Sequence, residues 1–101
     1  MMSAAVVCDA IRRRRLLELT YRGEVRLVEP YSHGVSHDGR QTLVAYQRAG
    51  GSSTGQAEGW KAFHVDEMDD VTVVDVPFVV NQPGYREGGY SKNLSEIHCC
   101  V

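Results

Sequence analysis

Two strand-like segments separated by a glycine-rich stretch constrain the fold of this chain more than any other feature. Residues 39–48 carry apolar or half-apolar side chains on both alternating faces, which is typical of a strand buried on both sides. Residues 59–65 place Phe63 on one face and Trp60 on the other, and an acidic turn at residues 66–70 follows. The pattern predicts two neighbouring strands of a small barrel and then one helical turn.

An amphipathic pattern near the start of the chain predicts a helix over residues 4–13. Val7, Ala10 and Ile11 are spaced to form one apolar stripe along it. Four arginines, residues 12–15, follow at its C-terminal end, where positive charge complements the helix dipole. We interpret this run as a solvated helix end, with a contact to phosphate or nucleic acid as the alternative.

Three further segments have the two-residue period of strands. Residues 15–22 predict a strand with one solvated face, and Gly23 supplies the turn into a second strand at residues 25–29. This strand ends at Pro30, which has no N–H to donate to a ladder. The β-branched run at residues 71–76 is the fifth strand. These five strands and one helix predict a mainly β, five-stranded antiparallel barrel with the helix over one open end, because so short a sheet must protect its edges.

The remaining segments have the composition of turns and loops. Residues 31–38 are rich in turn residues and end at Asp38-Gly39, a strong tight-turn signal. Residues 49–59 contain no large apolar side chain and predict an exposed loop. The phosphate-loop interpretation of this glycine-rich stretch is weak, because a strand follows it and not a helix.

Length and composition limit the classes of protein that this chain can represent. Its 101 residues predict one domain over residues 1–78, followed by a partly disordered extension over residues 79–101. The formal net charge of −2 provides no electrostatic case for nucleic-acid binding. No targeting or membrane segment is recognisable, and three cysteines do not form a disulfide framework. We therefore expect a cytoplasmic protein whose cysteines are thiols.

The order of these elements resembles the WYL domain, a small Sm-like barrel of the SH3-like class found in bacterial regulators. The motifs that carry the resemblance are Ala10-Ile11, Tyr21-Arg22-Gly23, residues 26–30 (Arg-Leu-Val-Glu-Pro), residues 43–46 (Leu-Val-Ala-Tyr) and residues 61–63 (Lys-Ala-Phe). The chain is also similar to short bacterial proteins that consist of this barrel alone, through Gly-Gly-Ser-Ser at 50–53, Gly-Trp-Lys at 59–61 and Pro-Gly-Tyr at 83–85. Of the three residues that name the family, only Leu43 is present; Gln41 and Thr42 replace the other two.

The resemblance implies a ligand pocket lined by basic side chains of the later strands, which in the family is thought to sense nucleic acids or nucleotides. The matching positions are Lys61 and His64, while Arg26 matches the arginine of the second strand. Glu67 stands where a further arginine is often found, and its carboxylate opposes an anionic ligand. Family members that regulate transcription have a winged helix before the barrel, so the resemblance leaves three roles for this chain: it senses a ligand, pairs with itself, or serves as a detachable partner of a DNA-binding protein.

We predict a ligand site formed by Arg26, Tyr46, Lys61 and His64, with the loop at residues 50–59 closing over it. These side chains offer two fixed positive charges, an aromatic hydroxyl and a titratable imidazole, which suit a small anionic or nucleotide-like molecule. The competing interpretation is that Lys61 and Arg26 form surface ion pairs with Glu29 and Glu67.

Three functions remain open at this stage. The first is a non-catalytic, ligand-sensing or regulatory module without a cofactor; the second is a protein-interaction module that forms a homodimer or binds a DNA-binding partner protein. The third is a weak binder of single-stranded nucleic acid that uses residues 12–15. Neither catalysis nor membrane binding is expected.

The histidines and cysteines do not predict a metal site. His33 and His37 have a suitable spacing only on a helix, and here they lie in a turn-rich segment. The run at residues 98–100, His-Cys-Cys, can chelate soft metals, but a flexible terminus makes a poor preorganised site. Cys8 has no base nearby in sequence that would mark it as a nucleophile.

Overall fold

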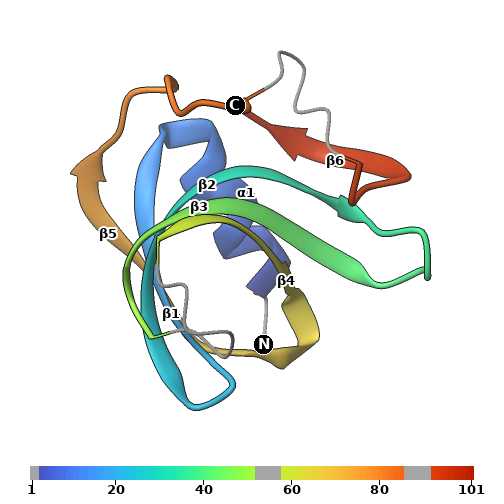
Figure 1. Ribbon diagram of the computed structural model, residues 1–101, viewed down its shortest axis with the longest axis horizontal. Helices are drawn as coiled ribbons and strands as arrows, with labels where there is room; N and C mark the ends of the chain where they lie inside the picture. The colour runs from blue at the N-terminus through green and yellow to red at the C-terminus, as the bar shows by residue number, and fades with distance from the viewer. Residues whose placement is uncertain (1–2, 52–57, 86–91) are drawn as a thin grey trace.

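The computed structural model describes residues 3–51, 58–85 and 92–101 (Figure 1). Within them, one helix is followed by strands that run antiparallel to their neighbours. The elements are α1 (Ser3–Arg13), β1 (Arg15–Tyr21), β2 (Glu24–Val35), β3 (Gln41–Gly50), β4 (Gly59–His64), η1 (Val65–Glu67, a short 3-10 helix), β5 (Met68–Pro77) and β6 (Glu96–Cys100). The predicted helix, its apolar stripe and the mainly β class are confirmed.

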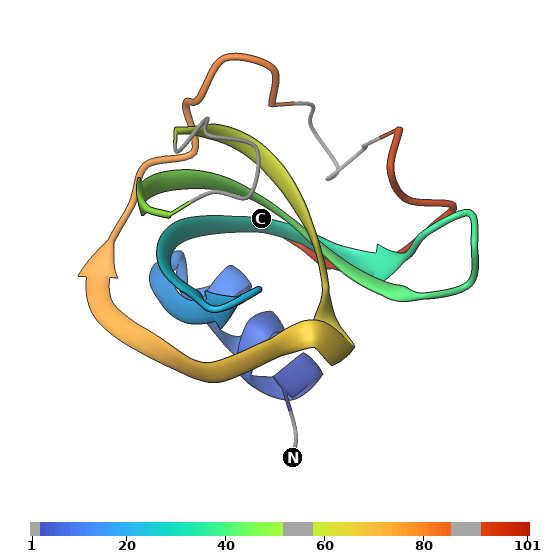
Figure 2. The same ribbon diagram turned by 60° about the horizontal axis from the view of Figure 1, so that its bottom comes forward.

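All the strands belong to one open sheet. Its order is β4-β3-β2-β1-β5, and β6 pairs with β2 outside this path. The sheet is strongly curved, so that β4 and β5 approach each other at η1 (Figure 2). The described part of the chain has six strands and not the predicted five, and no ladder between β4 and β5 closes the sheet into a barrel.

Strand β2 is longer than its sequence predicts. We expected a strand end at Pro30, but β2 continues through Pro30 to Val35. The register of β2 against β3 shifts between Pro30 and Ser32, and such an irregularity tolerates a residue without an N–H. Beyond this point, β2 exchanges its neighbour β1 for β6. The predicted turn segment at residues 31–38 is therefore mostly strand.

The two predicted tight turns are present. Arg22 and Gly23 both have positive φ values, 52° and 80°, which is the backbone of a type I′ hairpin turn between β1 and β2. Gly39, with φ of 84°, lies in the turn between β2 and β3, where its N–H donates to the Ser36 carbonyl at 2.9 Å. In both turns, glycine supplies a left-handed conformation that other residues adopt with strain.

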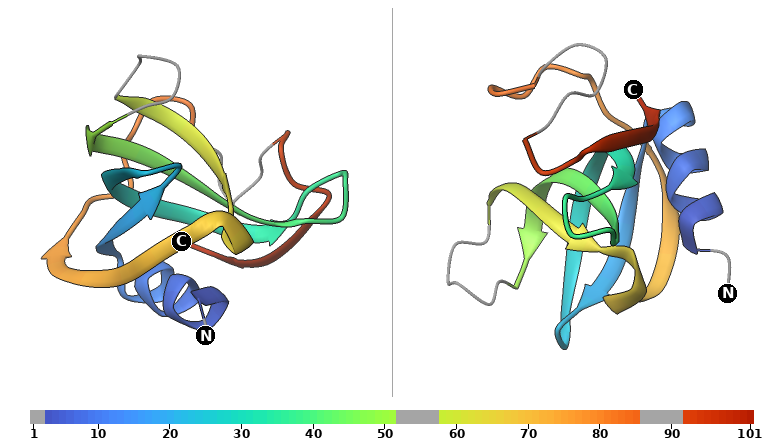
Figure 3. Two further views of the ribbon diagram at one scale, coloured as in Figure 1. Left: turned by 90° about the horizontal axis from the view of Figure 1, so that it is seen from below. Right: turned by 90° about the vertical axis from the view of Figure 1, so that its right-hand side faces the viewer.

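Helix α1 packs beside the curved sheet and contacts β5, β2, β1 and β6 (Figure 3). Its predicted stripe of Val7, Ala10 and Ile11 is fully buried. The core beneath it contains Leu17 and Leu19 from β1 together with side chains of β2 to β6. The helix therefore covers apolar surface of the sheet, as its periodicity predicts.

The C-terminal extension contributes to the sheet. Strand β6 pairs with β2 from Ser32 to Val35, although we predicted disorder for part of this extension. It lies beside α1, so the end of the chain returns to its first element (Figure 3). The domain boundary at residue 78 remains a prediction. Among the described residues, no helix is both long and apolar enough to span a bilayer.

Candidate functional site

The four predicted ligand-binding residues lie on neighbouring strands but do not share one face of the sheet. In the ladder between β3 and β4, Tyr46 is opposite Trp60 and Thr42 is opposite His64. Because side chains alternate along a strand, Tyr46 and His64 belong to the face that carries Trp60. Lys61 belongs to the other face, where its neighbour Phe63 is buried in the core.

Arg26 is built into the core on the face of Phe63. Its side chain is only 4% exposed, and its guanidinium lies 5.4 Å from the Tyr21 ring and 5.6 Å from the Phe63 ring. Nη2 donates to the Tyr21 carbonyl oxygen at 3.1 Å, and Glu24 lies 3.8 Å away. Arg26 therefore holds the β1–β2 hairpin against the core, and its charge is fixed in place.

The two carboxylates of the competing interpretation, Glu29 and Glu67, form ion pairs with arginines other than Arg26. Glu29 binds Arg48, with 2.7 Å between Oε2 and Nε. Glu67 lies 2.7 Å from Arg40 and 3.6 Å from Arg22. The observed contacts of these carboxylates thus involve arginines that we had not singled out as their partners.

Trp60 packs in an aromatic group. Its ring meets those of Tyr31 and Tyr46 edge to face, with centroids 4.8 Å and 5.6 Å apart. Its Nε1–H donates to the Pro83 carbonyl at 2.6 Å. A side chain at Gly84 would meet Trp60 Nε1 at 2.9 Å, so this approach of the backbone requires glycine. The Pro-Gly-Tyr step at residues 83–85 therefore covers the tryptophan.

Glu29, which the competing interpretation placed at the surface, is a buried carboxylate. It is 1% exposed, accepts a hydrogen bond from the Tyr31 hydroxyl at 3.0 Å, and also binds Arg48 and Gln82. Burial, together with the hydrogen bond and the charge of Glu29, raises the pKa of Tyr31 to about 12. The sequence places Glu29 directly before Pro30, and this position alone does not indicate that the carboxylate is buried. Glu29 joins β2 and β3 to the segment after β5.

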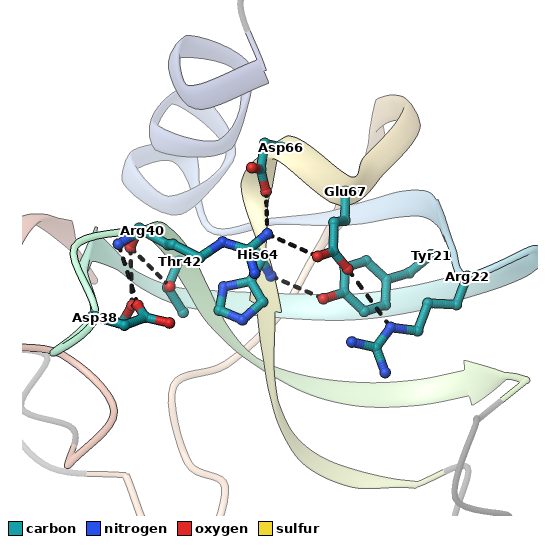
Figure 4. A network of polar contacts seen from close by, with 9 residues as sticks. Tyr21, Arg22, Asp38, Arg40, Thr42, His64, Asp66 and Glu67 are labelled. Atoms are coloured by element: carbon teal, nitrogen blue, oxygen red, sulfur yellow. Dashed lines mark hydrogen bonds and ion pairs between the residues drawn. The ribbon is translucent and has the colours of Figure 1, made fainter.

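A polar network lies where the start of β3 meets η1 (Figure 4). Arg40 Nη2 donates to Asp66 Oδ1 and to Glu67 Oε2, both at 2.7 Å. The Arg40 guanidinium is the main cause that holds the pKa of Glu67 below its ordinary value. The backbone N–H of His64 donates to the Tyr21 hydroxyl at 3.1 Å. Sequence reasoning missed Arg40, whose only signal was its position directly after the Asp38-Gly39 turn.

A hollow of about 580 Å³ adjoins this network and opens to solvent. Its lining comes from α1, the β2–β3 turn, the start of β3, η1 and the start of β5. The lining residues are Ala4, Gly39, Arg40, Gln41, Val65, Asp66, Met68 and Asp69. None of the four predicted ligand-binding residues lines it. Nearby, His64 Nδ1 is buried without a hydrogen-bond partner in the described part of the chain.

Cys8 and Cys99 form a disulfide, which contradicts our prediction of thiols. Strand β6 and helix α1 bring together residues that are 91 positions apart, so the sequence alone could not indicate the pair. His33 lies beside it, with Nδ1 3.6 Å from Cys8 Sγ. Burial lowers the pKa of His33 despite its hydrogen bond to Gln41. Among the described residues, Cys8, His33 and Cys99 form a cluster whose sulfur and nitrogen atoms are of the kind that bind a metal ion.

The arginine cluster at the C-terminal end of α1, residues 12–15, is partly neutralised. Arg13 lies 3.1 Å from Asp9, and Arg15 lies 3.1 Å from Asp75. Two of the four arginines thus face carboxylates, and the choice between a solvated helix end and a contact with phosphate stays open. In the predicted loop at residues 50–59, residues 52–57 lie outside the described residues, so its closure over a ligand stays a prediction.

Comparison with known families identifies the class of protein. The model of the WYL domain matches residues 3–73, from the start of α1 into β5. This chain therefore belongs to the WYL domain family. Searches of curated proteins and of solved structures found no match. The cover over Trp60 and strand β6 both lie beyond the matched residues.

Proposed function

We propose that this protein is a non-catalytic, ligand-sensing or regulatory WYL module that acts in the cytosol and binds a small anionic or nucleotide-like molecule. Its curved sheet corresponds, in this proposal, to the SH3-like (Sm-like) barrel of the resemblance. Membership of the family supports a regulatory role. The observation that carries the proposal is the face of β3 and β4 on which Tyr46, Trp60 and His64 lie together.

This face combines groups that suit a nucleotide-like ligand. Tyr46 is a half-buried aromatic side chain supported by Trp60, and a base can stack on such a ring with a gain of about 1–3 kcal/mol. His64 is four residues from Trp60 on the same strand, a distance of about 13 Å at 3.3 Å per residue. Its Nδ1 is buried without a partner among the described residues, and rotation of the half-buried ring is needed to bring this nitrogen to a polar group of the ligand.

The positive charges of the predicted site take different roles in this proposal. β4 is the last strand of the sheet path, so the long side chain of Lys61 can reach around its free edge toward the ligand. Arg26 is buried against the Phe63 ring, and it contributes a fixed positive charge without contact. Glu67 is already bound by Arg40 and Arg22, which reduces its repulsion of an anion.

Thermal-shift measurements with adenosine monophosphate, guanosine monophosphate and inorganic phosphate test this site. We expect at least one nucleotide to raise the melting temperature of the parent protein. Lys61→Glu and His64→Ala should abolish this shift while the unliganded melting temperature changes little. Lys92→Glu is the matched control, because it makes the same charge change at an exposed position. A shift that persists in both Lys61→Glu and His64→Ala would exclude the site.

Binding of single-stranded nucleic acid, together with a separate DNA-binding partner, is the second candidate. Arg12 and Arg14 are exposed at the end of α1 and supply the positive charge for it. A short deoxythymidine oligonucleotide should then bind with an affinity that falls steeply with salt. The double variant Arg12→Glu/Arg14→Glu should lose this binding and keep the nucleotide shift. Retention of oligonucleotide binding by that variant would exclude the cluster.

Self-association is the third candidate, and exposed apolar residues near the outer strand β5 favour it. Val76 is 43% exposed and Val79 is 70% exposed. Unpaired strand edges with apolar side chains are common sites of pairing between chains. Light scattering should then report a dimer whose population falls in the Val79→Lys variant. A monomer at high protein concentration would exclude this candidate.

A further inference from the structure

Three metal-binding side chains converge between helix α1 and the sheet. Cys8 comes from α1, His33 from β2 and Cys99 from β6, and their ligand atoms all lie within 4.8 Å of one another. His33 and Cys99 are only 3% and 6% exposed. Such burial limits the rotamers of the side chains, so the group is preorganised by three different elements.

The sheet register aims two of these side chains at the helix. His33 is directly opposite Cys99 in the ladder between β2 and β6. Opposite residues of an antiparallel pair point to the same face, with Cβ atoms about 4.5–5.5 Å apart. Cys99 belongs to the same core cluster as the buried residues of α1, and Cys8 packs against that cluster. The arrangement therefore follows from strand pairing and helix packing.

The hydrogen bond of His33 to Gln41 orients the imidazole for coordination. His33 Nε2 lies 3.2 Å from Gln41 Oε1, and because this oxygen only accepts, Nε2 carries the proton. Nδ1 then presents a lone pair toward Cys8 Sγ at 3.6 Å. Metal-binding histidines typically donate their second ring N–H to an oxygen in this way. Gln41 is thus placed as the outer partner of a histidine ligand.

We propose that the reduced protein binds one zinc ion through Cys8 Sγ, Cys99 Sγ and His33 Nδ1, so that the disulfide and the metal are alternative states of one site. A dithiol or phosphine reductant donates two electrons to the disulfide, and two protons convert the sulfurs to thiols. Zinc then replaces these two protons and bonds to both thiolates. In a reducing compartment, the metal-bound state is the one available to the chain.

One existing distance between ligand atoms already fits such a site. Bonds of about 2.3 Å to sulfur and 2.0–2.1 Å to nitrogen in a tetrahedron place the ligand sulfur and nitrogen about 3.6 Å apart. Cys8 Sγ and His33 Nδ1 are already 3.6 Å apart. The two sulfurs must separate to about 3.8 Å, the corresponding distance in a tetrahedral site. Reduction breaks the bond between the two sulfurs and frees them for this movement.

The donor set favours zinc over harder divalent cations. Two thiolates and an imidazole are ligands of zinc, whereas calcium and magnesium require oxygen. Three protein ligands leave the fourth position of a tetrahedral ion for water, and Cys8 is only half-buried. The proposed centre is therefore a three-ligand zinc site with an open position.

Titration of the full chain, reduced with a phosphine under anaerobic conditions, tests the proposal. We expect one equivalent of zinc to bind, as measured by competition with a chromophoric chelator and by native mass spectrometry. Cobalt(II) in place of zinc should give the intense visible bands of a tetrahedral ion and a thiolate-to-cobalt band. The oxidised protein should bind neither metal. Absence of these bands in the reduced parent, or equal zinc binding by the oxidised parent, would overturn the proposal.

Variants identify the ligands within the same experiment. Cys8→Ser, Cys99→Ser and His33→Gln should each weaken zinc binding by more than the roughly 10–100-fold that we expect for Gln41→Leu, which removes only the outer partner. Cys100→Ser is the matched control, because it makes the same change one residue farther along β6, and it should bind zinc as the parent does. Parent-like affinity in Cys8→Ser or Cys99→Ser would refute the assignment of the ligands.

A second readout does not depend on any variant. Diamide accepts two electrons and two protons from a pair of thiols and converts them to a disulfide. Bound zinc holds both sulfurs as metal thiolates, so one equivalent of zinc should slow the diamide-driven formation of the Cys8–Cys99 disulfide at least about tenfold. Peptide mapping by mass spectrometry measures this rate. An unchanged rate with zinc would argue against coordination by these two sulfurs.

Discussion

Two polar clusters meet at the start of β3, and they differ in the solvent that reaches them. Gln41 binds His33, which belongs to the buried cluster of Cys8, His33 and Cys99. Its neighbour Arg40 binds Asp66 and Glu67 at the surface. His33 is 3% exposed, whereas the Arg40 and Glu67 side chains are each 36% exposed. Water and salt screen the second cluster, so short distances alone do not make it important for stability.

The largest expected effect is the loss of the packing that supports the buried cluster. Ile11 is fully buried on the stripe of α1. Ile11→Asp should lower the free energy of unfolding by at least about 3 kcal/mol, because it removes core packing and buries a carboxylate without a partner. Urea denaturation followed by the fluorescence of Trp60 measures this loss. Arg12→Asp, at the exposed neighbouring position, should change it little. Equal stability of the Ile11 and Arg12 variants would mean that α1 is not docked.

Opening the disulfide should have the next largest effect. The Cys8–Cys99 bond closes a loop with a sequence separation of 91 residues. Reduction in the presence of a metal chelator should cost about 2–4 kcal/mol of unfolding free energy, because the unfolded chain regains its freedom. Cys99→Ser should reproduce this loss under oxidising conditions, and Cys100→Ser should not. If reduction leaves the urea midpoint unchanged, the covalent link does not constrain the unfolded state.

The buried carboxylate Glu29 tests whether burial or charge determines the cost. Glu29→Met removes the acceptor of the Tyr31 hydroxyl at similar volume, and it should lower the free energy of unfolding by about 1–3 kcal/mol. Glu18→Met makes the same chemical change on the exposed face of β1 and should have a much smaller effect. Both are measured by urea denaturation. Similar losses in the two variants would show that burial of Glu29 is not what makes it matter.

The smallest effect is expected in the exposed network. The Arg40 hydrogen bond lowers the pKa of Glu67 below its ordinary value of 4.5. The pair therefore contributes stability above that pH and loses it as the pH falls through the lowered pKa. Glu67→Gln should slightly lower the melting temperature at neutral pH, and the difference should vanish at low pH or in high salt. Melting curves across pH measure it. A difference that grows in acid would contradict this sign.

Local sequence patterns determined much of the fold. The period of α1, the alternation in β1 and the Asp38-Gly39 turn were all predicted, because each depends on residues that are neighbours in the chain. The doubly buried strand β3 was also predicted from its own residues. The relative placement of the four candidate ligand-binding residues was predicted only in part. Tyr46 and His64 lie on one face of the sheet, whereas Lys61 lies on the opposite face because side chains alternate along a strand.

The tertiary structure alone decided which of these elements are neighbours and which side chains are buried between them. The continuation of β2 past Pro30, the pairing of β6 and the meeting of Cys8, His33 and Cys99 depend on contacts between distant parts of the chain. A single sequence contains no local signal for such contacts, because the free energy that selects them comes from burial of surfaces contributed by several elements together. For this protein, sequence determined the elements, and packing determined which of their polar side chains became buried neighbours.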